Sequence, residues 1–456
     1  GGFTAVTPVV ITINTLGSFS STAATSLISN ATTGGNGGYI KVTMGSTASG
    51  IGAITANGAV AGNGGRVDLT INTTATSIGA AAVAANQIRT ISANSGTAGA
   101  GGTVLITTPS IGLTTIGATP ISVTAAGATG TGGIIGIDVG TATLTLAATT
   151  VMSANATGTG SASTDPSTLN GGNAIRIIAG AISGVAANSF NAQAGQAAGN
   201  TGNGGKINIA LSSALTASVI GAVSTIAGLA GGTGGDITIS AANTLTTGAI
   251  SATGFGPGAA TVVGGAVSIT SVNNDTITTG AINVSSLGAA TGNAGTINFF
   301  TNAAISTGAL TLQGTSSGTG GALNIGTLGG GLANPLSITT GAISTTSGAT
   351  GTGGAVGLYS QTFITTGAIT TSAGTGGNLT VIASNGAITT GAITTSGAIN
   401  ATNRAGLVNL DNSEASFAIS TGAGAITASS GGGFTAVTPV VITINTLGSF
   451  SSTAAT

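Results

Sequence analysis

The sequence predicts an all-β protein whose chain coils into a parallel β-solenoid, also called a β-helix. Three observations predict this fold class. Residues 432–456 repeat residues 1–25 letter for letter, a short hexad recurs through the second half, and a Gly-Gly pair followed by alternating apolar residues recurs along the chain. Self-similarity at a period of about 20–50 residues is typical of architectures in which each repeat packs on its neighbours.

The exact repeat has an offset of 431 residues (432 minus 1), and 25 consecutive identities exclude chance. We interpret residues 1–431 as one tandem-repeat block of continuous solenoid and residues 432–456 as the start of the next identical block. Because the first residue is not Met and the pattern stops inside a unit, we expect a window cut from a longer polypeptide. Copying such a block head to tail builds length, which favours a structural or adhesive role over catalysis.

The Gly-Gly pair opens each unit. It precedes residues that alternate apolar and polar, the period of two expected of a strand with one buried face. Clear copies begin at Gly37, Gly64, Gly101, Gly132, Gly204, Gly234, Gly264, Gly320, Gly353 and Gly376. With degenerate copies at Ala294 and Ala405, the sequence predicts about fourteen coils per block, each of roughly 31 residues.

The hexad supplies two further strands to each coil. In the unit that begins at Gly264, residues 267–269 predict a first strand, residues 276–278 a second and residues 282–284 a third, with Gly280 at a corner. The hexads read LTTGAI, ITTGAI or ISTGAL and begin at Leu245, Ile277, Ile305, Ile338, Ile364 and Ile388, with a decayed copy at Ile419.

Stacking of the coils predicts ladders of equivalent residues about 4.8 Å apart. The first hexad residue should be buried, the next should point outward, and a slip of one residue would put Thr in the core. The hexad Gly should stack at a corner where a positive φ or a close backbone approach excludes a side chain. The predicted buried ladder is Ile277, Ile305, Ile338, Ile364 and Ile388, and the predicted outward row is Thr246, Thr278, Ser306, Thr339, Thr365 and Thr389.

Composition excludes several classes of function. Charged residues make up 3% of the chain, far below the roughly 25% of a typical soluble protein. The net charge of −1 and the lack of a Lys/Arg cluster exclude an electrostatic nucleic-acid interface. No apolar run reaches the ~18 residues of a membrane span. Cys and His are absent, so no disulfide framework exists, and the lack of Cys fits an exported protein.

The strings GGNGG, GGxIxI and ITTGAI, in a Cys-free chain rich in Gly, Thr, Ser and Ala, resemble the β-strand-repeat regions of filamentous-haemagglutinin-like exoproteins and autotransporter passengers. The resemblance covers essentially the whole chain and is compositional and periodic. It implies a right-handed parallel β-helix, export across the outer membrane and a role as a surface filament or adhesin. The exact tandem copy favours a fibre-forming or sheath-like relative.

Two acidic motifs invite a functional interpretation. Residues 231–236, GGTGGD, match the start of a calcium-binding nonapeptide, but no nine-residue repeat follows. Asp236 also takes the place after the Gly-Gly pair that Arg66 and Lys206 take in other units. Asp411 and Glu414 are the only acids close in sequence, whereas glycoside hydrolysis needs converging carboxylates. Since the other acids are scattered and the basic residues do not cluster, we predict no metal, catalytic or cofactor-binding residues and no cofactor.

Other motifs follow from composition. The Gly-rich loops open strands, whereas a phosphate cradle precedes a helix. Asn-x-Ser/Thr sequons are expected in a chain rich in Asn and Thr, so glycosylation stays open; they lie at Asn30, Asn72, Asn155, Asn274, Asn283, Asn378 and Asn400. The outward Thr row could order water and bind ice, or form a packing or solvated face.

The sequence therefore predicts an extracellular or cell-surface structural protein, not an enzyme, that builds a fibre, sheath or filamentous adhesin. Its main partner should be itself, through continuation of the array and lateral packing of rods, because little charge opposes self-association. Host or neighbouring cell surfaces and glycans are further candidate partners. The alternatives are an inert adhesin stalk with a distant binding tip, a polysaccharide-active β-helix enzyme and an ice-binding solenoid.

Overall fold

A computed structural model of the chain contains β-strands and turns, with no α-helix among the residues it describes. The chain divides into two compact units, Gly1–Ala230 with Gly235–Ala241, and Gly231–Gly234 with Ala242–Thr456. No helix in the described part of the chain is long and apolar enough to cross a membrane. The described residues are 9–45, 50–72, 76–78, 87–108, 113–116, 121–125, 130–146, 152–156, 173–184, 188–195, 199, 201–258, 262–289, 291–328, 333–397, 405–412, 417–421, 425–428 and 442–452.

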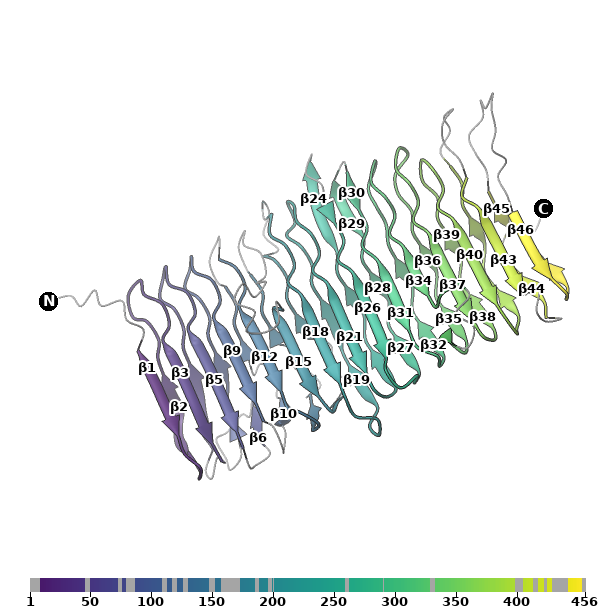
Figure 1. The fold of residues 1–456 in the computed structure, drawn as a ribbon. Coiled ribbons are helices and arrows are strands. Elements are labelled where there is room, and N and C mark those ends of the chain that lie inside the picture. Colours follow the sequence, from purple (N-terminus) through teal and green to yellow (C-terminus); the bar gives the residue numbers. More distant parts are fainter. Residues whose placement is uncertain are drawn as a thin grey trace. The chain divides into compact units, whose positions relative to one another are not determined.

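The first unit is built on a ladder of parallel strands that follow the Gly-Gly pairs, here called the first long ladder (Figure 1). Apolar residues alternate with polar ones, so that in one strand Val67, Leu69 and Ile71 are buried while Arg66 and Asp68 face outward. The strands are β1 (Val10–Asn14), β3 (Tyr39–Met44), β5 (Arg66–Ile71), β9 (Thr103–Thr107), β12 (Ile134–Asp138), β15 (Ile175–Ala179), β18 (Ile207–Leu211) and β21 (Ile237–Ala241).

Shorter strands complete the coils of the first unit, again in parallel pairs such as β2 with β4 and β14 with β17. They are β2 (Ser21–Ile28), β4 (Ile51–Thr55), β6 (Thr76–Ile78), β7 (Gln87–Ile88), β8 (Ile91–Ser92), β10 (Leu113–Ile116), β11 (Ile121–Ser122), β13 (Thr143–Thr145), β14 (Met152–Ser153), β16 (Ala181–Ser183), β17 (Asn188–Asn191), β19 (Ser218–Ile220) and β20 (Ala222–Ser224).

The second unit repeats the plan with a second long ladder. Its strands are β26 (Val267–Ser271), β31 (Ile297–Phe300), β34 (Leu323–Ile325), β37 (Val356–Ser360), β40 (Leu379–Ala383), β43 (Val408–Asn412) and β46 (Ile442–Thr446). The two long ladders together contain fifteen strands in the described residues, and fourteen of these precede the second copy that begins at residue 432, in line with the expected coil number. The chain is thus an all-β parallel solenoid, as the sequence predicts.

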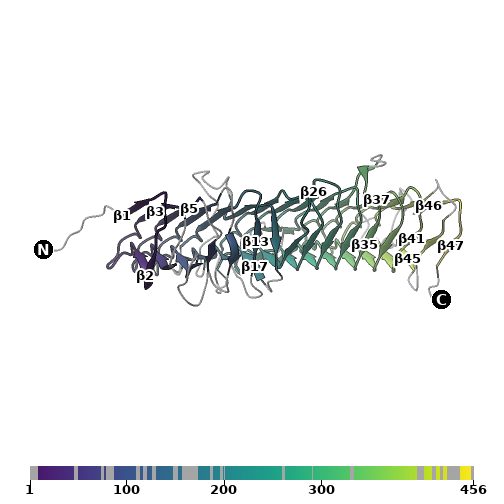
Figure 2. The ribbon, with the colours of Figure 1, turned by 90° about the horizontal axis from the view of Figure 1, so that it is seen from below.

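Each of the six clear hexads forms two strands of the second unit, one on either side of its Gly. The strands of successive coils stack side by side (Figure 2). The second sheet consists of β22 (Leu245–Thr247), β27 (Ile277–Thr279), β32 (Ile305–Thr307), β35 (Ile338–Thr340), β38 (Ile364–Thr366), β41 (Ile388–Thr389), β44 (Ile419–Ser420) and β47 (Phe450–Ser451). The third sheet contains β23 (Ile250–Ser251), β28 (Ile282–Asn283), β33 (Leu310–Thr311), β36 (Ile343–Ser344), β39 (Ile369–Thr370), β42 (Ile393–Thr394) and β45 (Ile426–Thr427).

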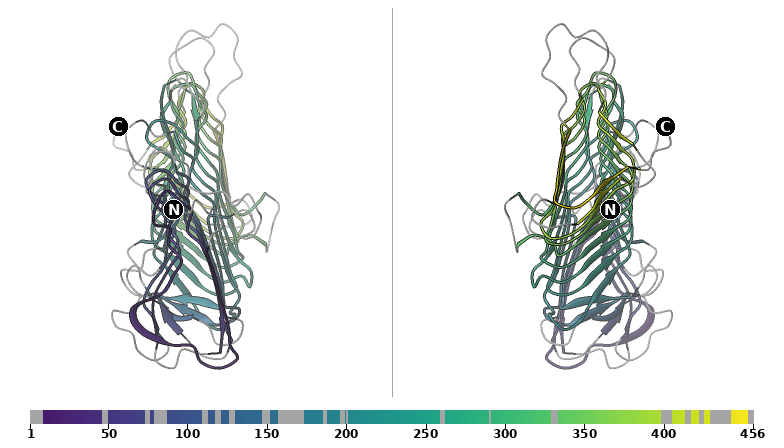
Figure 3. Two further views of the ribbon diagram at one scale, coloured as in Figure 1. Left: turned by 90° about the vertical axis from the view of Figure 1, so that its left-hand side faces the viewer. Right: turned by 90° about the vertical axis from the view of Figure 1, so that its right-hand side faces the viewer.

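The predicted isoleucine ladder is confirmed. Ile277 pairs with Ile305, Ile305 with Ile338, and the register continues through Ile364 to Ile388. All five side chains are at most 1% exposed. The coils of each unit wind around a narrow interior (Figure 3). Aliphatic side chains of this kind are buried there. The burial of these stacked side chains makes the largest favourable contribution to the free energy of folding.

Paired loop strands extend some coils of the second unit beyond the third sheet. They are β24 (Gly254–Gly258) with β29 (Ser286–Ala289), and β25 (Val262–Val263) with β30 (Gly292–Asn293), each pair again parallel.

The hexad glycine is required by a close approach of backbones and not by a positive φ. A Cβ on Gly280 would lie 2.8 Å from the carbonyl carbon of Gly248 and 2.9 Å from the nitrogen of Ala249, in the preceding coil. Gly280 has no positive φ. The equivalent glycines of later coils, Gly308, Gly341, Gly367 and Gly391, would place a Cβ 2.7 or 2.8 Å from a backbone nitrogen of the coil before.

The Thr that precedes the Gly of each hexad is buried, which the sequence pattern does not predict. In Thr247, Thr279, Thr307, Thr340, Thr366 and Thr390 the exposed fraction is 2–7%. Each hydroxyl donates to the carbonyl oxygen of the hexad Gly that follows, at 2.9–3.1 Å. Buried polar groups are tolerated when they are hydrogen-bonded, so these hydroxyls satisfy the corner carbonyls from inside the core.

The two copies of the exact repeat adopt the same first strand and turn. Residues 11–14 lie in β1, and their copies at 442–445 lie in β46. The turn after the strand is also shared, since Gly17 donates to the Thr15 hydroxyl at 3.1 Å and Gly448 to that of Thr446 at 3.0 Å.

The copies differ at the following strand. Phe450 and Ser451 form β47, whereas Phe19 and Ser20 are not in a strand. β47 pairs with β44 of the preceding coil, and the described residues include no coil before Val9 that could pair with Phe19. The tandem block of 431 residues stays a prediction.

Candidate functional site

The outward residues of the second and third sheets form two rows of small polar side chains. In the second sheet Thr339, Thr365 and Thr389 are exposed, and their neighbours in the row are half-buried. This is the outward row that the sequence predicts, in the predicted register. The parallel row on the third sheet is Ser251, Asn283, Thr311, Ser344, Thr370, Thr394 and Thr427.

No charged side chain interrupts either row between residues 245 and 427. The rows can therefore donate and accept hydrogen bonds along the whole second unit without attracting or repelling a net charge. This is a surface for packing or hydration rather than for acid–base chemistry.

Charged residues gather on the outer face of the first long ladder. Four basic and three acidic residues lie there, about half of the thirteen in the sequence, namely Lys41, Arg66, Asp68, Asp138, Arg176, Lys206 and Asp236. Residues that are scattered in the sequence therefore share one face of the solenoid, although they are spread over several coils. The coils stack residues that lie some thirty positions apart in the chain, so that Lys41, Asp68 and Arg176, for example, lie in one row of the register.

Tyr39, Arg66 and Asp68 form a closed network on this face. The Tyr39 hydroxyl donates to Asp68 Oδ2 at 2.6 Å, and Arg66 Nε donates to Asp68 Oδ1 at 2.8 Å. The guanidinium lies 5.5 Å from the centre of the Tyr39 ring, within the range of a cation–π contact. The hydrogen bond to Asp68 raises the pKa of Arg66. The network joins Tyr39 of one coil to Arg66 and Asp68 of the next, and so it fixes the two neighbouring coils.

Titration of Tyr39 tests this network. Burial, and then the hydrogen bond to Asp68, raise the pKa of Tyr39 above its usual value near 10. A raised pKa means that the folded state holds the proton more tightly, so the stabilisation is present below pH ~10 and is lost as pH rises through the folded pKa. In a Tyr359→Phe background Tyr39 is the only tyrosine, and near-ultraviolet absorbance should show a midpoint above 10.

Asp68→Asn should lower that midpoint, and Asp236→Asn, which removes an acid from the same face, should leave it unchanged. A midpoint at or below that of free tyrosine in the folded protein would contradict the network.

The candidate calcium motif has a simpler explanation at its acidic residue. Asp236 Oδ2 lies 3.3 Å from Lys206 Nζ of the neighbouring coil. Both side chains are about half exposed, so the pair contributes little to stability. Across the described residues no group of three or more His, Cys, Asp or Glu side chains is placed to hold a metal ion.

The carboxylate pair can be placed only in part. Asp411 faces outward on β43, where Asn445 donates to its Oδ2 at 3.4 Å. Glu414 lies outside the described residues. The described structure therefore does not test their pairing.

The sequons differ in how their amides are used. Asn30, Asn155 and Asn378 each accept a backbone N–H from the next coil, at 2.7, 2.7 and 3.0 Å. Asn283 accepts from Ser285 within its own coil. Asn274 is exposed in a turn with a φ of 64°. Asn72 is half-buried and has a bonding partner, and Asn400 lies outside the described residues.

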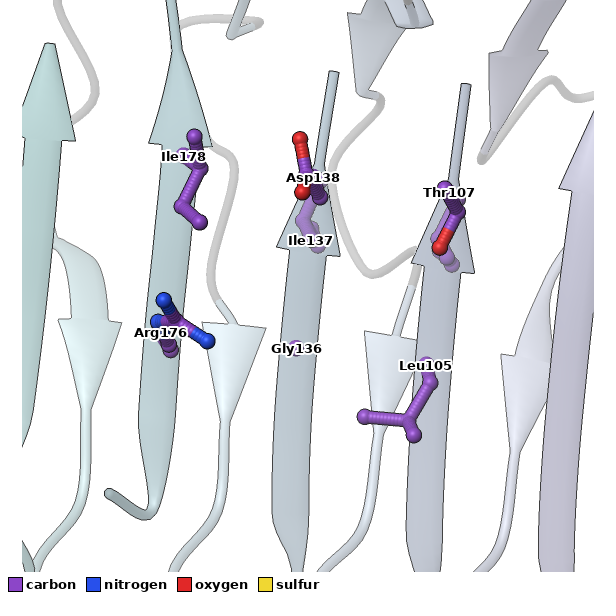
Figure 4. A pocket seen from close by; sticks show the side chains of 8 residues that line it. Leu105, Thr107, Gly136, Ile137, Asp138, Arg176 and Ile178 are labelled. Atoms are coloured by element: carbon purple, nitrogen blue, oxygen red, sulfur yellow. The ribbon is translucent and has the colours of Figure 1, made fainter. Parts of the chain in front are cut away.

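A shallow hollow of about 190 Å³ opens on the outer face of the first long ladder (Figure 4). It exists because Gly136 places no side chain between Leu105 on β9 and Arg176 on β15, its register partners on either side. Thr107, Asp138 and Ile178 form the next row of the lining. The sequence does not predict this hollow, whose only signal is a Gly at an outward strand position.

Comparison of the chain with models of protein families, with curated proteins and with solved structures found no match.

Proposed function

We propose that this protein is an extracellular structural solenoid that builds a fibre, sheath or filamentous adhesin from tandem blocks of 431 residues. The proposal includes membership of the filamentous-haemagglutinin-like or autotransporter-passenger exoproteins, which its repeat strings resemble. Self-association, by continuation of the array and by lateral packing, is the activity proposed.

One observation carries the proposal. The second unit presents two uninterrupted rows of Ser, Thr and Asn side chains, held in register by stacked coils. Because these rows carry no charge, no electrostatic repulsion opposes the approach of a second rod. Short polar side chains on a β-surface also lose little conformational entropy when they are packed. A face of this kind is suited to repeated lateral contact.

The exact copy at residues 432–456 supports growth along the chain. The first copy forms the strand and turn that the second forms, so a second block can begin with the structure of the first. Each coil added in this way supplies backbone partners for the coil before it, which is how solenoids propagate.

Three alternatives make different demands on the structure. An inert stalk needs a fully solvated rod and no lateral contact. An ice-binding surface would use the regular row of Thr339, Thr365 and Thr389 as a flat array of hydroxyls and methyls, and it would produce thermal hysteresis in dilute solution. A polysaccharide-active enzyme would need converging acids.

Light scattering of the 456-residue chain tests the proposal. We expect the mean mass to rise with protein concentration at low and at high ionic strength, because the contact is not electrostatic. A monomer that persists at high concentration would contradict lateral packing and favour the stalk. Thermal hysteresis without association would favour ice binding.

A further inference from the structure

Arg176 lies half-buried at one edge of the hollow over Gly136, and its guanidinium makes no hydrogen bond or ion pair with any described residue. The charged groups on either side of it along the face are already paired. Arg66 bonds Asp68, and Lys206 bonds Asp236. Arg176 is thus a donor of five N–H groups that no described residue accepts from, and it borders an open space.

Asp138 has a second carboxylate oxygen in the same hollow, to which no described residue donates. Its Oδ1 accepts the backbone N–H of Gly140 at 2.9 Å, which fixes the carboxylate. Asp138 stands in the row next to Arg176, two residues further along the strands, so the two groups are about 7 Å apart along the strand direction. No ion pair joins them within the described structure.

Apolar side chains complete the hollow. Leu105 and Ile178 occupy its two far corners, on β9 and β15. The lining therefore offers one guanidinium without a partner among the described residues, one fixed carboxylate acceptor about 7 Å away along the strands, and two aliphatic surfaces. Small-ligand sites commonly combine an apolar lining with a few placed polar groups in this way.

We propose that this hollow binds a carboxylate-bearing sugar unit, such as one residue of an acidic polysaccharide. The planar guanidinium of Arg176 would take the sugar carboxylate through two parallel hydrogen bonds. Asp138 would accept a hydroxyl of the same ring, and Leu105 and Ile178 would pack against its C–H face. Asp138 repels a doubly charged phosphate about twice as strongly as a singly charged carboxylate at the same distance, which favours the carboxylate.

The inference goes beyond the proposed function and is independent of it. It assigns a ligand class to one site on the first unit, whereas association is assigned to the uncharged rows of the second unit. A variant that no longer binds the sugar should still associate into rods, and a variant that no longer associates should still bind the sugar.

Calorimetric titration of the 456-residue chain with a tetramer of glucuronic acid tests the site. We expect saturable binding, and a glucose tetramer of the same length should bind at least about tenfold more weakly because it lacks the charged hydrogen bonds. Arg176→Gln should weaken glucuronate binding by about tenfold or more. Gly136→Val should do the same by filling the hollow, with no change of charge.

Lys206→Gln is the matched control, since it removes one positive charge from the same face outside the hollow. The affinity of the Lys206→Gln variant for the glucuronic acid tetramer should stay within about twofold of that of the unsubstituted protein. Circular dichroism of each variant checks that the β-structure is retained. No binding of the glucuronate tetramer, equal binding of the glucose tetramer, or equal losses in Lys206→Gln and Arg176→Gln would each overturn the proposal.

Discussion

Replacing Gly354 with Ala should open the coils around it. A Cβ at this position would overlap the carbonyl oxygen of Gly321 and would lie 2.7 Å from the carbonyl carbon and oxygen of Gly320, all in the preceding coil. The residue cannot move aside, because its N–H donates to Thr345 O and its carbonyl accepts the Thr345 hydroxyl, both at 2.8 Å. Overpacking against side chains lowers the free energy of unfolding by about 1–3 kcal/mol. Because the atoms contacted here belong to rigid backbone, we expect Gly354→Ala to lower it by ~3 kcal/mol or more.

The damage should stay local, because each coil of a solenoid contacts only its neighbours. Amide hydrogen exchange should show lost protection in β34, β37 and β40, while β27 and β28 keep theirs. Gly17→Ala is the control, since its Cβ would meet only Thr15 Oγ1 at an ordinary 3.7 Å. Unchanged protection in Gly354→Ala would show that the stacking geometry described here is wrong.

Replacing three exposed threonines of the second sheet with lysine should weaken the lateral contact without unfolding the solenoid. Thr339, Thr365 and Thr389 are exposed register partners in successive coils, so each lysine would reach solvent. Each rod would then carry three like charges on the packing face, about 4.8 Å apart. We expect the concentration needed for association to rise by about tenfold or more at low salt, with partial recovery at high salt.

The matched control places the same charge on the second long ladder. Ser268, Asn298 and Asn324 are outward register partners on β26, β31 and β34. Their triple lysine variant should associate like the unsubstituted chain. Equal loss of association in both variants would mean that net charge, and not the hydroxyl rows, governs the assembly.

The hexads carried enough information to predict the second and third sheets. Their six letters begin and end with a large aliphatic residue on either side of a fixed Thr-Gly pair, so Ile338 and Ile364 had one consistent place in the core. The coils differ in length, with hexads 24 to 33 residues apart. The differences lie in the turns and loops, and hence they leave the register of the strands unchanged.

Other features depend on contacts that a linear pattern does not show. Thr340 and Thr366 resemble surface residues, yet each is buried because the adjacent corner carbonyl accepts its hydroxyl. The positions of Lys206 and Asp236 relative to the Gly-Gly pair were visible, but their pairing follows from stacking. The hollow at Gly136 arises from the absence of a side chain between two neighbouring strands, which only their register reveals.

Electron microscopy of the assembled protein can show directly whether the solenoid rods pack side by side through their rows of hydroxyl side chains. Material from the unsubstituted chain at high concentration should show rods packed side by side, and the Thr339, Thr365 and Thr389 triple lysine variant should show separate rods under the same conditions. Separate rods in the unsubstituted sample, with the solenoid intact by circular dichroism, would contradict the account of a laterally packing fibre.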